Sequence, residues 1–152
     1  IYQCDWSSDV CSSDLAMAFK HGKNAVFKVD NSGGTLTNIS TYLNNISMPR
    51  SIETGETTSF GNSAKTYIVG LSDSTLSIDG TWDATLDAHL AGVLGQDASL
   101  TFEYGPEGSG TGAIKYTGEC FLTSFETSSP VADVVTFTAE FQVTGTITRT
   151  TF

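Results

Sequence analysis

The sequence has few basic residues, little cysteine or histidine, and no long apolar run. Seven Lys and Arg stand against 17 Asp and Glu, which gives a formal net charge of −10. Because contacts to phosphate need Lys and Arg, this balance disfavours binding to nucleic acid or to anionic lipid. No stretch approaches the roughly 18 consecutive apolar residues of a membrane-spanning helix. We therefore expect neither a transmembrane segment nor a membrane partner.

The first fifteen residues differ from the rest of the chain. Asp5–Leu15, DWSSDVCSSDL, has neither a helical nor a strand period. When this stretch is translated back into DNA with permitted codons, the DNA sequence resembles the adapter oligonucleotide that is ligated to DNA fragments for short-read sequencing. No basic region followed by an apolar one is present, as a secretory signal would require. We interpret residues 1–15 as an artefactual leader that takes no part in the fold.

Without this leader, residues 16–152 are expected to form a single domain, with Met17 as its start. The leader holds three aspartates and no basic residue, so its removal takes the net charge from −10 to −7. It also holds two of the three cysteines, and no cluster of Cys or His follows them to complete a metal site. The remaining Cys120 has no partner for an intramolecular disulfide, and we expect it to be a small buried or half-buried strand residue.

The chain offers few side chains that could carry out chemistry. Its histidines are His21, in a basic opening segment, and His89, in a predicted helix. Asp87 lies two residues before His89, a spacing that places them on different helix faces, so we expect a solvated histidine rather than a metal or catalytic site. Glu53 and Glu56 lie in a flexible segment and not on a rigid strand end. No catalytic, cofactor-binding or metal-binding residue is predicted, and the protein is not expected to be an enzyme.

The abundance of Thr, Ser and Gly favours a β-rich fold, since Thr suits strands and Gly suits turns. Apolar and polar residues alternate most clearly over Ser74–Trp82 and Val135–Val143. Further strand segments are expected over Ala25–Val29, Leu43–Met48, Thr66–Val69, Ser99–Tyr104, Ala113–Tyr116 and Gly118–Ser128. The Gly-rich segment between Tyr104 and Ala113 is expected to be the turn of a hairpin.

A single helix is expected over residues 83–95, DATLDAHLAGVLG. Leu86, Leu90, Val93 and Leu94 form one apolar stripe in this segment. Asp83 is suited to cap its start and Gly95 to end it. About three turns of helix are unstable alone, so this helix must pack on a sheet. The predicted fold class is mainly β: a sandwich or partly closed barrel of about seven or eight antiparallel strands with one flanking α-helix.

The segment Arg50–Lys65, RSIETGETTSFGNSAK, is polar and long for a loop inside one domain. Two interpretations remain open. It could be a mobile surface loop, or an arm that orders only against a neighbouring subunit.

The order of these segments resembles that of the tail tube (major tail) proteins of long-tailed bacteriophages. The resemblance covers nearly all of residues 19–149. It rests on the opening GKNAVFKVDNSGG, the long polar arm after Pro49, the alternating strand that runs into Trp82 and Asp83, the helix ATLDAHLAGVLG, and the Phe-rich closing segment DVVTFTAEFQVTGTITR.

The resemblance implies a structural virion protein that forms hexameric rings, which stack into the tail tube through which DNA is ejected. The arm would contact adjacent rings. Its candidate interface residues are Arg50, Ile52, Glu53, Glu56, Phe60 and Lys65. The implied partners are further copies of the chain and the tape measure, tail terminator and distal tail proteins. DNA would pass without specific binding, because a chain of net charge −7 repels it. Assembly in the host cytoplasm and a final location in the virion tail are also implied.

Two other hypotheses remain. One is a monomeric immunoglobulin-like decoration or adhesion domain of a phage or bacterium, in which the arm would stay disordered. The other is a small β-rich hydrolase, which would need titratable groups that converge on one site.

Overall fold

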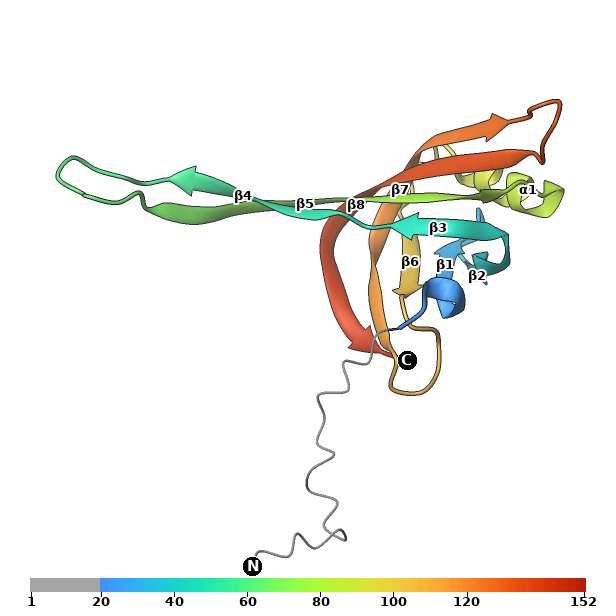
Figure 1. The fold of residues 1–152 in the computed structure, drawn as a ribbon, viewed down its shortest axis with the longest axis horizontal. Helices are drawn as coiled ribbons and strands as arrows, with labels where there is room; N and C mark the ends of the chain where they lie inside the picture. The colour runs from blue at the N-terminus through green and yellow to red at the C-terminus, as the bar shows by residue number, and fades with distance from the viewer. Residues whose placement is uncertain (1–19) are drawn as a thin grey trace, which may run out of the picture.

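The computed structural model describes residues 20–152 (Figure 1), so the interpretation of residues 1–15 and the start at Met17 lie outside the described residues. The elements, in chain order, are η1 (Gly22–Asn24), β1 (Val26–Asp30), β2 (Leu36–Asn38), η2 (Ser40–Tyr42), β3 (Leu43–Ser47), β4 (Arg50–Glu56), β5 (Tyr67–Thr81), α1 (Ala84–Val93), β6 (Leu100–Gly105), β7 (Ile114–Ser128) and β8 (Thr136–Thr151).

All eight strands of the described chain belong to one antiparallel sheet. Its order is β2-β1-β6-β7-β8-β5-β3, and β4 also pairs with β5. Three strand spacings separate β1 from β8, which would be about 14 Å in a flat sheet. The rings of Phe27 in β1 and Phe141 in β8 nevertheless lie 6.2 Å apart, edge to face. The sheet therefore curls on itself around one core without closing into a barrel, which confirms the predicted mainly β fold.

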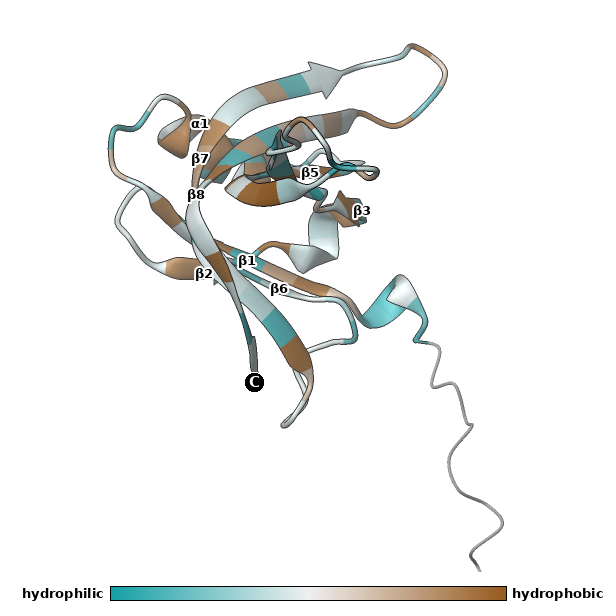
Figure 2. Cartoon of the chain, turned by 90° about the vertical axis from the view of Figure 1, so that its left-hand side faces the viewer, coloured by the Kyte–Doolittle hydropathy of each residue, from teal (hydrophilic) through white to brown (hydrophobic). Residues whose placement is uncertain are grey.

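The core is made of alternate residues of the strands together with one face of the helix. Figure 2 shows hydrophobic and hydrophilic residues alternating along β7 and β8. The predicted apolar face of the last strand is confirmed, because Phe137, Ala139, Phe141 and Val143 are all buried. The other buried hydrophobic residues are Phe27, Val29, Ile39, Leu76, Ile78, Leu86, Leu90, Val93, Leu100, Phe102, Cys120 and Leu122.

Cys120 is buried, as predicted. Burial raises the pKa of its thiol to about 12, and the nearby Glu119 and Asp30 carboxylates act in the same direction. Since the thiolate is the reactive form, this side chain behaves as an inert core residue.

The helix α1 begins and ends where its sequence predicts. The Asp83 carboxylate accepts a hydrogen bond from the Thr85 backbone N–H (2.8 Å), and Gly95 follows the helix with a φ of 76°. Leu86, Leu90 and Val93 face the core.

The two ionisable residues in the middle of α1 have structural contacts. The expectation of a solvated His89 is wrong: its ring is half-buried, and Nε2 lies 3.0 Å from the carbonyl oxygen of Asp30. Asp87 accepts a hydrogen bond from the indole N–H of Trp82 (3.2 Å). These contacts attach the helix to the end of β1 and to the residue that follows β5, and neither residue joins a catalytic pair.

Two sequence expectations about the strands are corrected. Thr66–Val69 and Ser74–Trp82 are not two strands but parts of one 15-residue strand, β5. Arg50–Glu56 is not loop but strand β4, which is ordered by pairing with β5 within the same chain. The remaining loop of the arm spans residues 57–66. Backbone pairing to β5 explains both corrections, because hydrogen bonding across a hairpin orders a polar strand that has no apolar period of its own.

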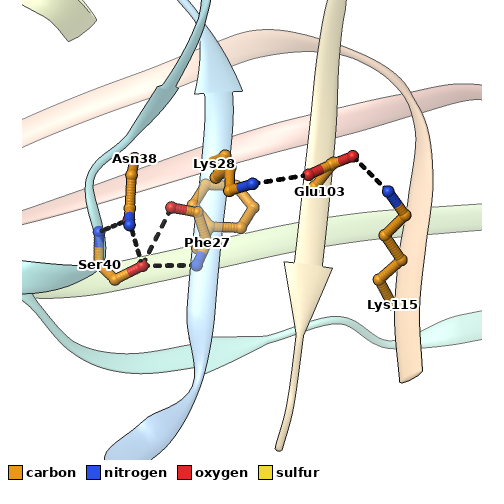
Figure 3. A network of polar contacts seen from close by, with 6 residues as sticks. All are labelled: Phe27, Lys28, Asn38, Ser40, Glu103 and Lys115. Carbon is orange, nitrogen blue, oxygen red and sulfur yellow. Dashed lines mark hydrogen bonds and ion pairs between the residues drawn. The ribbon is translucent and has the colours of Figure 1, made fainter. Parts of the chain in front are cut away.

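An ion network links β1, β6 and β7 on the outside of the sheet (Figure 3). The Glu103 carboxylate lies 3.1 Å from Lys28 Nζ and 2.7 Å from Lys115 Nζ. In the same view, Ser40 Oγ accepts a hydrogen bond from the Phe27 backbone N–H (2.7 Å), which connects η2 to β1. Burial alone would raise the pKa of Glu103, but hydrogen bonds and positive charge from Lys115 and Lys28 together hold it below its usual 4.5.

Replacing Glu103 with glutamine is expected to remove a pH-dependent part of the stability. A lowered pKa means that the carboxylate stabilises the fold above the unfolded-state value near 4.5, and that this contribution is lost as the pH falls through the lower folded-state pKa. The difference in the free energy of unfolding between wild type and E103Q, measured by urea denaturation, should shrink below pH 4.5. E126Q, at an exposed position of β7, is the control. A difference independent of pH would contradict the assignment.

Candidate subunit-interface arm

The predicted arm, residues 50–65, is part of a longer β-hairpin, residues 50–73, that stands out from the body of the protein (Figure 1). From here on, the arm means this whole hairpin. It consists of β4, the loop 57–66 and the outer part of β5. Its register pairs Arg50 with Ser74 at the base and Glu56 with Tyr67 near the tip, with an irregularity between Ile52 and Thr54. Every residue of the arm is exposed, so no part of it belongs to the core.

Hydrogen bonds within the arm order its tip. The Thr57 backbone N–H donates to the Thr66 carbonyl (2.8 Å), and the Thr66 N–H donates to the Thr58 hydroxyl (3.1 Å). Gly61 takes a φ of 94°, which a residue with a side chain rarely adopts. The tip therefore forms an ordered turn.

The predicted interface residues are spread along this hairpin and do not form one cluster. Glu56 and Lys65 form an ion pair near the tip (3.2 Å), and Phe60 projects fully exposed from the loop. Ile52, 60% exposed, pairs with Ser72. Glu53 lies at the irregularity of β4 and is exposed. The carboxylates of Glu53 and Glu56 are thus on a projecting ribbon without a cavity of their own, which is unsuited to paired acid–base chemistry.

Sequence reasoning missed four interface candidates in the arm. Tyr67, Ile68, Val69 and Leu71 are large apolar residues with more than half of their surface exposed. The signal was present in the sequence, since YIVGL is an almost continuous apolar run beside a polar segment. Together with Ile52 and Phe60, they give the arm six of the nine exposed large hydrophobic residues of the described chain. Exposed apolar surface gathered on one element makes these residues further candidates for a contact with another protein.

Arg50 fixes the base of the arm. Its guanidinium lies over the ring of Tyr116 in β7, 4.9 Å from the ring centroid, and Tyr116 stacks against Tyr104 at 6.4 Å. These contacts join the first residue of β4 to the part of the sheet where β6 pairs with β7. Cation–aromatic attraction of this kind restrains the position from which the hairpin projects.

Replacing Arg50 with alanine is expected to lower the free energy of unfolding by about 0.5–1 kcal/mol, as for other exposed cation–aromatic pairs. R50K should recover part of this loss, because an ammonium is also attracted to the Tyr116 ring. K65A is the matched control, since the exposed Lys65–Glu56 pair at the tip should contribute about 0.5 kcal/mol or less. Urea denaturation measures all three. Equal losses in R50A and K65A would contradict a special role for the base.

A second surface is polar and free of cations. On the outward side of β5, β8 and β7, two rows of paired residues alternate hydroxyl and carboxylate groups. They are Ser77, Glu140 and Ser124 in one row, and Asp79, Thr138 and Glu126 in the other. All seven Lys and Arg of the chain lie elsewhere. The polar face, as we call these six residues, therefore carries only negative charge.

The described residues 20–152 contain no group of three or more His, Cys, Asp and Glu that could hold a metal ion. Among the helices of this same region, none has both the length and the apolar character needed to cross a membrane.

The described chain is thus a one-sheet β domain with a projecting, partly apolar hairpin. The chain matches the family described as "Phage tail tube protein" over residues 19–149, and it belongs to that family. No curated protein sequence is significantly similar to it.

Solved structures share the fold at low sequence identity. A chain from the tail of an empty gene transfer agent particle, refined with C6 symmetry, has a TM-score of 0.72 and 17% identity, covering 87% of this chain and 99% of that one. The SPP1 tail tube has a TM-score of 0.70 and 11% identity, covering 88% and 80%. An extracellular contractile injection system, a sheath–tube complex in the extended state, has a TM-score of 0.65 and 15% identity, covering 90% and 95%.

Proposed function

We propose that this chain assembles with copies of itself into stacked hexameric rings, which form a tail tube through which DNA leaves a phage particle. Membership of the tail tube family supports the tube, and the C6 symmetry of the similar gene transfer agent tail supports six subunits per ring. The observation that carries the proposal is that the six large apolar side chains of the arm are exposed in a single chain. Its role is structural and does not require catalysis.

The arm is the proposed contact between subunits, with Arg50, Ile52, Glu53, Glu56, Phe60 and Lys65 among its interface residues. A two-stranded hairpin is only marginally stable in water when nothing packs on it. Burying a large apolar side chain contributes roughly 1.5–3 kcal/mol, so covering several of them gives strong association. The arm is thus suited to join one ring to the next.

The polar face is the proposed lining of the tube. Its carboxylates repel the phosphate backbone of DNA. Its hydroxyl groups are hydrated and carry no positive charge that could bind phosphate. In this arrangement DNA passes without specific binding. The tape measure, tail terminator and distal tail proteins are the further proposed partners, with assembly in the host cytoplasm and a final place in the virion tail.

Electron microscopy and analytical ultracentrifugation of the purified chain at rising concentration test the proposal. Sixfold rings or tubes of uniform diameter are expected, in an amount that increases with concentration. A chain that remains monomeric, both alone and when expressed with the other tail proteins, would contradict self-assembly. That result would favour a monomeric decoration or adhesion domain.

A further inference from the structure

Gln142 of β8 lies at the point where the arm leaves the body of the protein. The last backbone pair between β5 and β8 on this side is Thr75 with Gln142. Beyond this pair β5 continues into the arm, where it is paired with β4 along its other edge (Figure 1). Within the described residues, the edge of β5 that faced β8 therefore has no further strand partner.

The side-chain amide of Gln142 takes the place of the next backbone pair. Its Nε2 donates hydrogen bonds to the Asp73 carboxylate (2.8 Å) and to the Ser74 carbonyl (3.2 Å), and it also lies 3.4 Å from the carbonyl oxygen of Val143. All three partners only accept hydrogen bonds, so this position needs the amide nitrogen. An ionised glutamate here would have no proton to donate, and it would repel the carboxylate of Asp73.

This contact lies on the outward side of the sheet. Gln142 points outward, because Phe141 and Val143 on either side of it are buried. Asp73 points to the same side as Asp79 of the polar face, because residues at even spacing along a strand share one side. The amide therefore restrains the arm from the outward face.

Arg50 restrains the arm from the opposite face. It pairs with Ser74, which lies on the same side of β5 as the buried Leu76, so Arg50 is on the core side of the sheet. There its guanidinium lies over the ring of Tyr116, 4.9 Å from the ring centroid. A bend of the arm towards either face would thus stretch one of the two contacts.

We infer that Gln142 is a positioning residue for assembly, because its amide fixes the direction in which the arm leaves the body through Asp73 and Ser74. The consequence for assembly rests on the proposed role of the arm as a contact between subunits. An arm of fixed direction meets its neighbour without first losing conformational freedom. An arm of variable direction is competent to bind for only part of the time, and its apparent affinity falls by that fraction.

Distances between two spin labels measure the direction of the arm in single chains. The labels are attached to Ala64→Cys in the loop of the arm and to Thr148→Cys in β8, both at exposed positions. The chain also carries Cys4→Ser and Cys11→Ser, and the remaining Cys120 is buried. The end of β8 lies to one side of the arm (Figure 1), so a change in the direction of the arm changes this distance. The wild-type contacts should give one narrow distribution.

Two substitutions should broaden this distribution: Gln142→Ala, which removes the amide, and Gln142→Glu, which also adds repulsion. Adding Asp73→Asn to Gln142→Glu exchanges donor and acceptor, so the pair forms again and the distribution should narrow. Asn45→Glu is the matched control. Asn45 donates to Asp79 in the body of the sheet (2.9 Å), so this substitution places a like charge beside a carboxylate away from the arm and should leave the distribution unchanged. A distribution that neither Gln142 substitution broadens, or that Asp73→Asn does not narrow again, overturns the inference.

Assembly of the unlabelled variants is measured separately by analytical ultracentrifugation. Gln142→Ala should raise the concentration needed for assembly roughly tenfold, because losing a hydrogen bond to a charged group reduces the time that the arm spends in its binding direction. Circular dichroism should show an unchanged fold. Assembly of Gln142→Ala at the wild-type concentration would overturn the inferred role in assembly. If the wild-type chain forms no assembly, the proposed function fails, while the label distances still decide whether Gln142 positions the arm.

Discussion

Replacing Gly80 with alanine is expected to have a larger effect on stability than any surface substitution in this protein. Gly80 of β5 pairs with Leu43 of β3. A Cβ atom at position 80 would lie 2.0 Å from the carbonyl oxygen of Tyr42 and 2.9 Å from the Cα of Leu43. Both are backbone atoms, which cannot rotate away as a side chain could. Overpacking commonly costs 1–3 kcal/mol, and we expect a loss of about 3 kcal/mol or more here.

Urea denaturation of G80A measures this loss, and amide hydrogen exchange locates it. The exchange of β3 amides should accelerate, because β3 must separate from β5 to admit the methyl group. G110A is the matched control: the same change in an exposed turn, where no atom lies within 4 Å of the added Cβ, should alter stability by about 0.5 kcal/mol or less. Wild-type stability in G80A would show that the two strands are not this close.

The close approach at Gly80 is the kind of feature that sequence patterns do not reveal. Alternation over Ser74–Trp82 predicts the strand and places Leu76, Ile78 and Gly80 on one face, and the structure confirms that face as buried. It gives no sign that Gly80 lies against the backbone of Tyr42, because that contact depends on how the start of β3 pairs with the end of β5. A glycine inside a strand indicates a close approach in general but does not identify the partner.

The single helix and the strand of the last Phe-rich segment were predictable because local signals agree with the fold. Asp83 and Gly95 lie at helix ends that the structure confirms, and the apolar period of Val135–Val143 matches its buried face. The half-buried His89 was not predictable, since its partner is a backbone carbonyl of Asp30, far away in the sequence.

The arm was predicted as a segment but not as a hairpin. Arg50–Lys65 has polar residues and no period, and a strand of this kind is ordered by its partner rather than by its own sequence. The partner strand, β5, begins at Tyr67, just after this segment, and its outer part carries most of the apolar surface of the arm. From the sequence alone, the run YIVGL predicts only the start of a strand. A near-continuous apolar run is typical of a strand that is covered on both faces, and within a single chain this run is exposed.

Shortening the arm is expected to abolish assembly and leave the fold intact. Replacing residues 54–69 with Asn-Gly joins Glu53 to Gly70, two residues that already lie side by side in the hairpin, through a sequence suited to a tight turn. None of the removed residues is buried, so the free energy of unfolding should change by about 1 kcal/mol or less. Four of the six large apolar side chains of the arm are lost: Phe60, Tyr67, Ile68 and Val69.

The size of the assembly defect follows from those four side chains. Even partial burial of each in a neighbour should contribute several kcal/mol in total, so the concentration needed for assembly should rise at least about a hundredfold. Analytical ultracentrifugation across a concentration series measures this shift. The matched control is G110A in the exposed turn between β6 and β7, which keeps every residue of the arm and should assemble like wild type. A shortened chain that assembles at the wild-type concentration would place the contact between subunits on the body of the protein instead of on its arm.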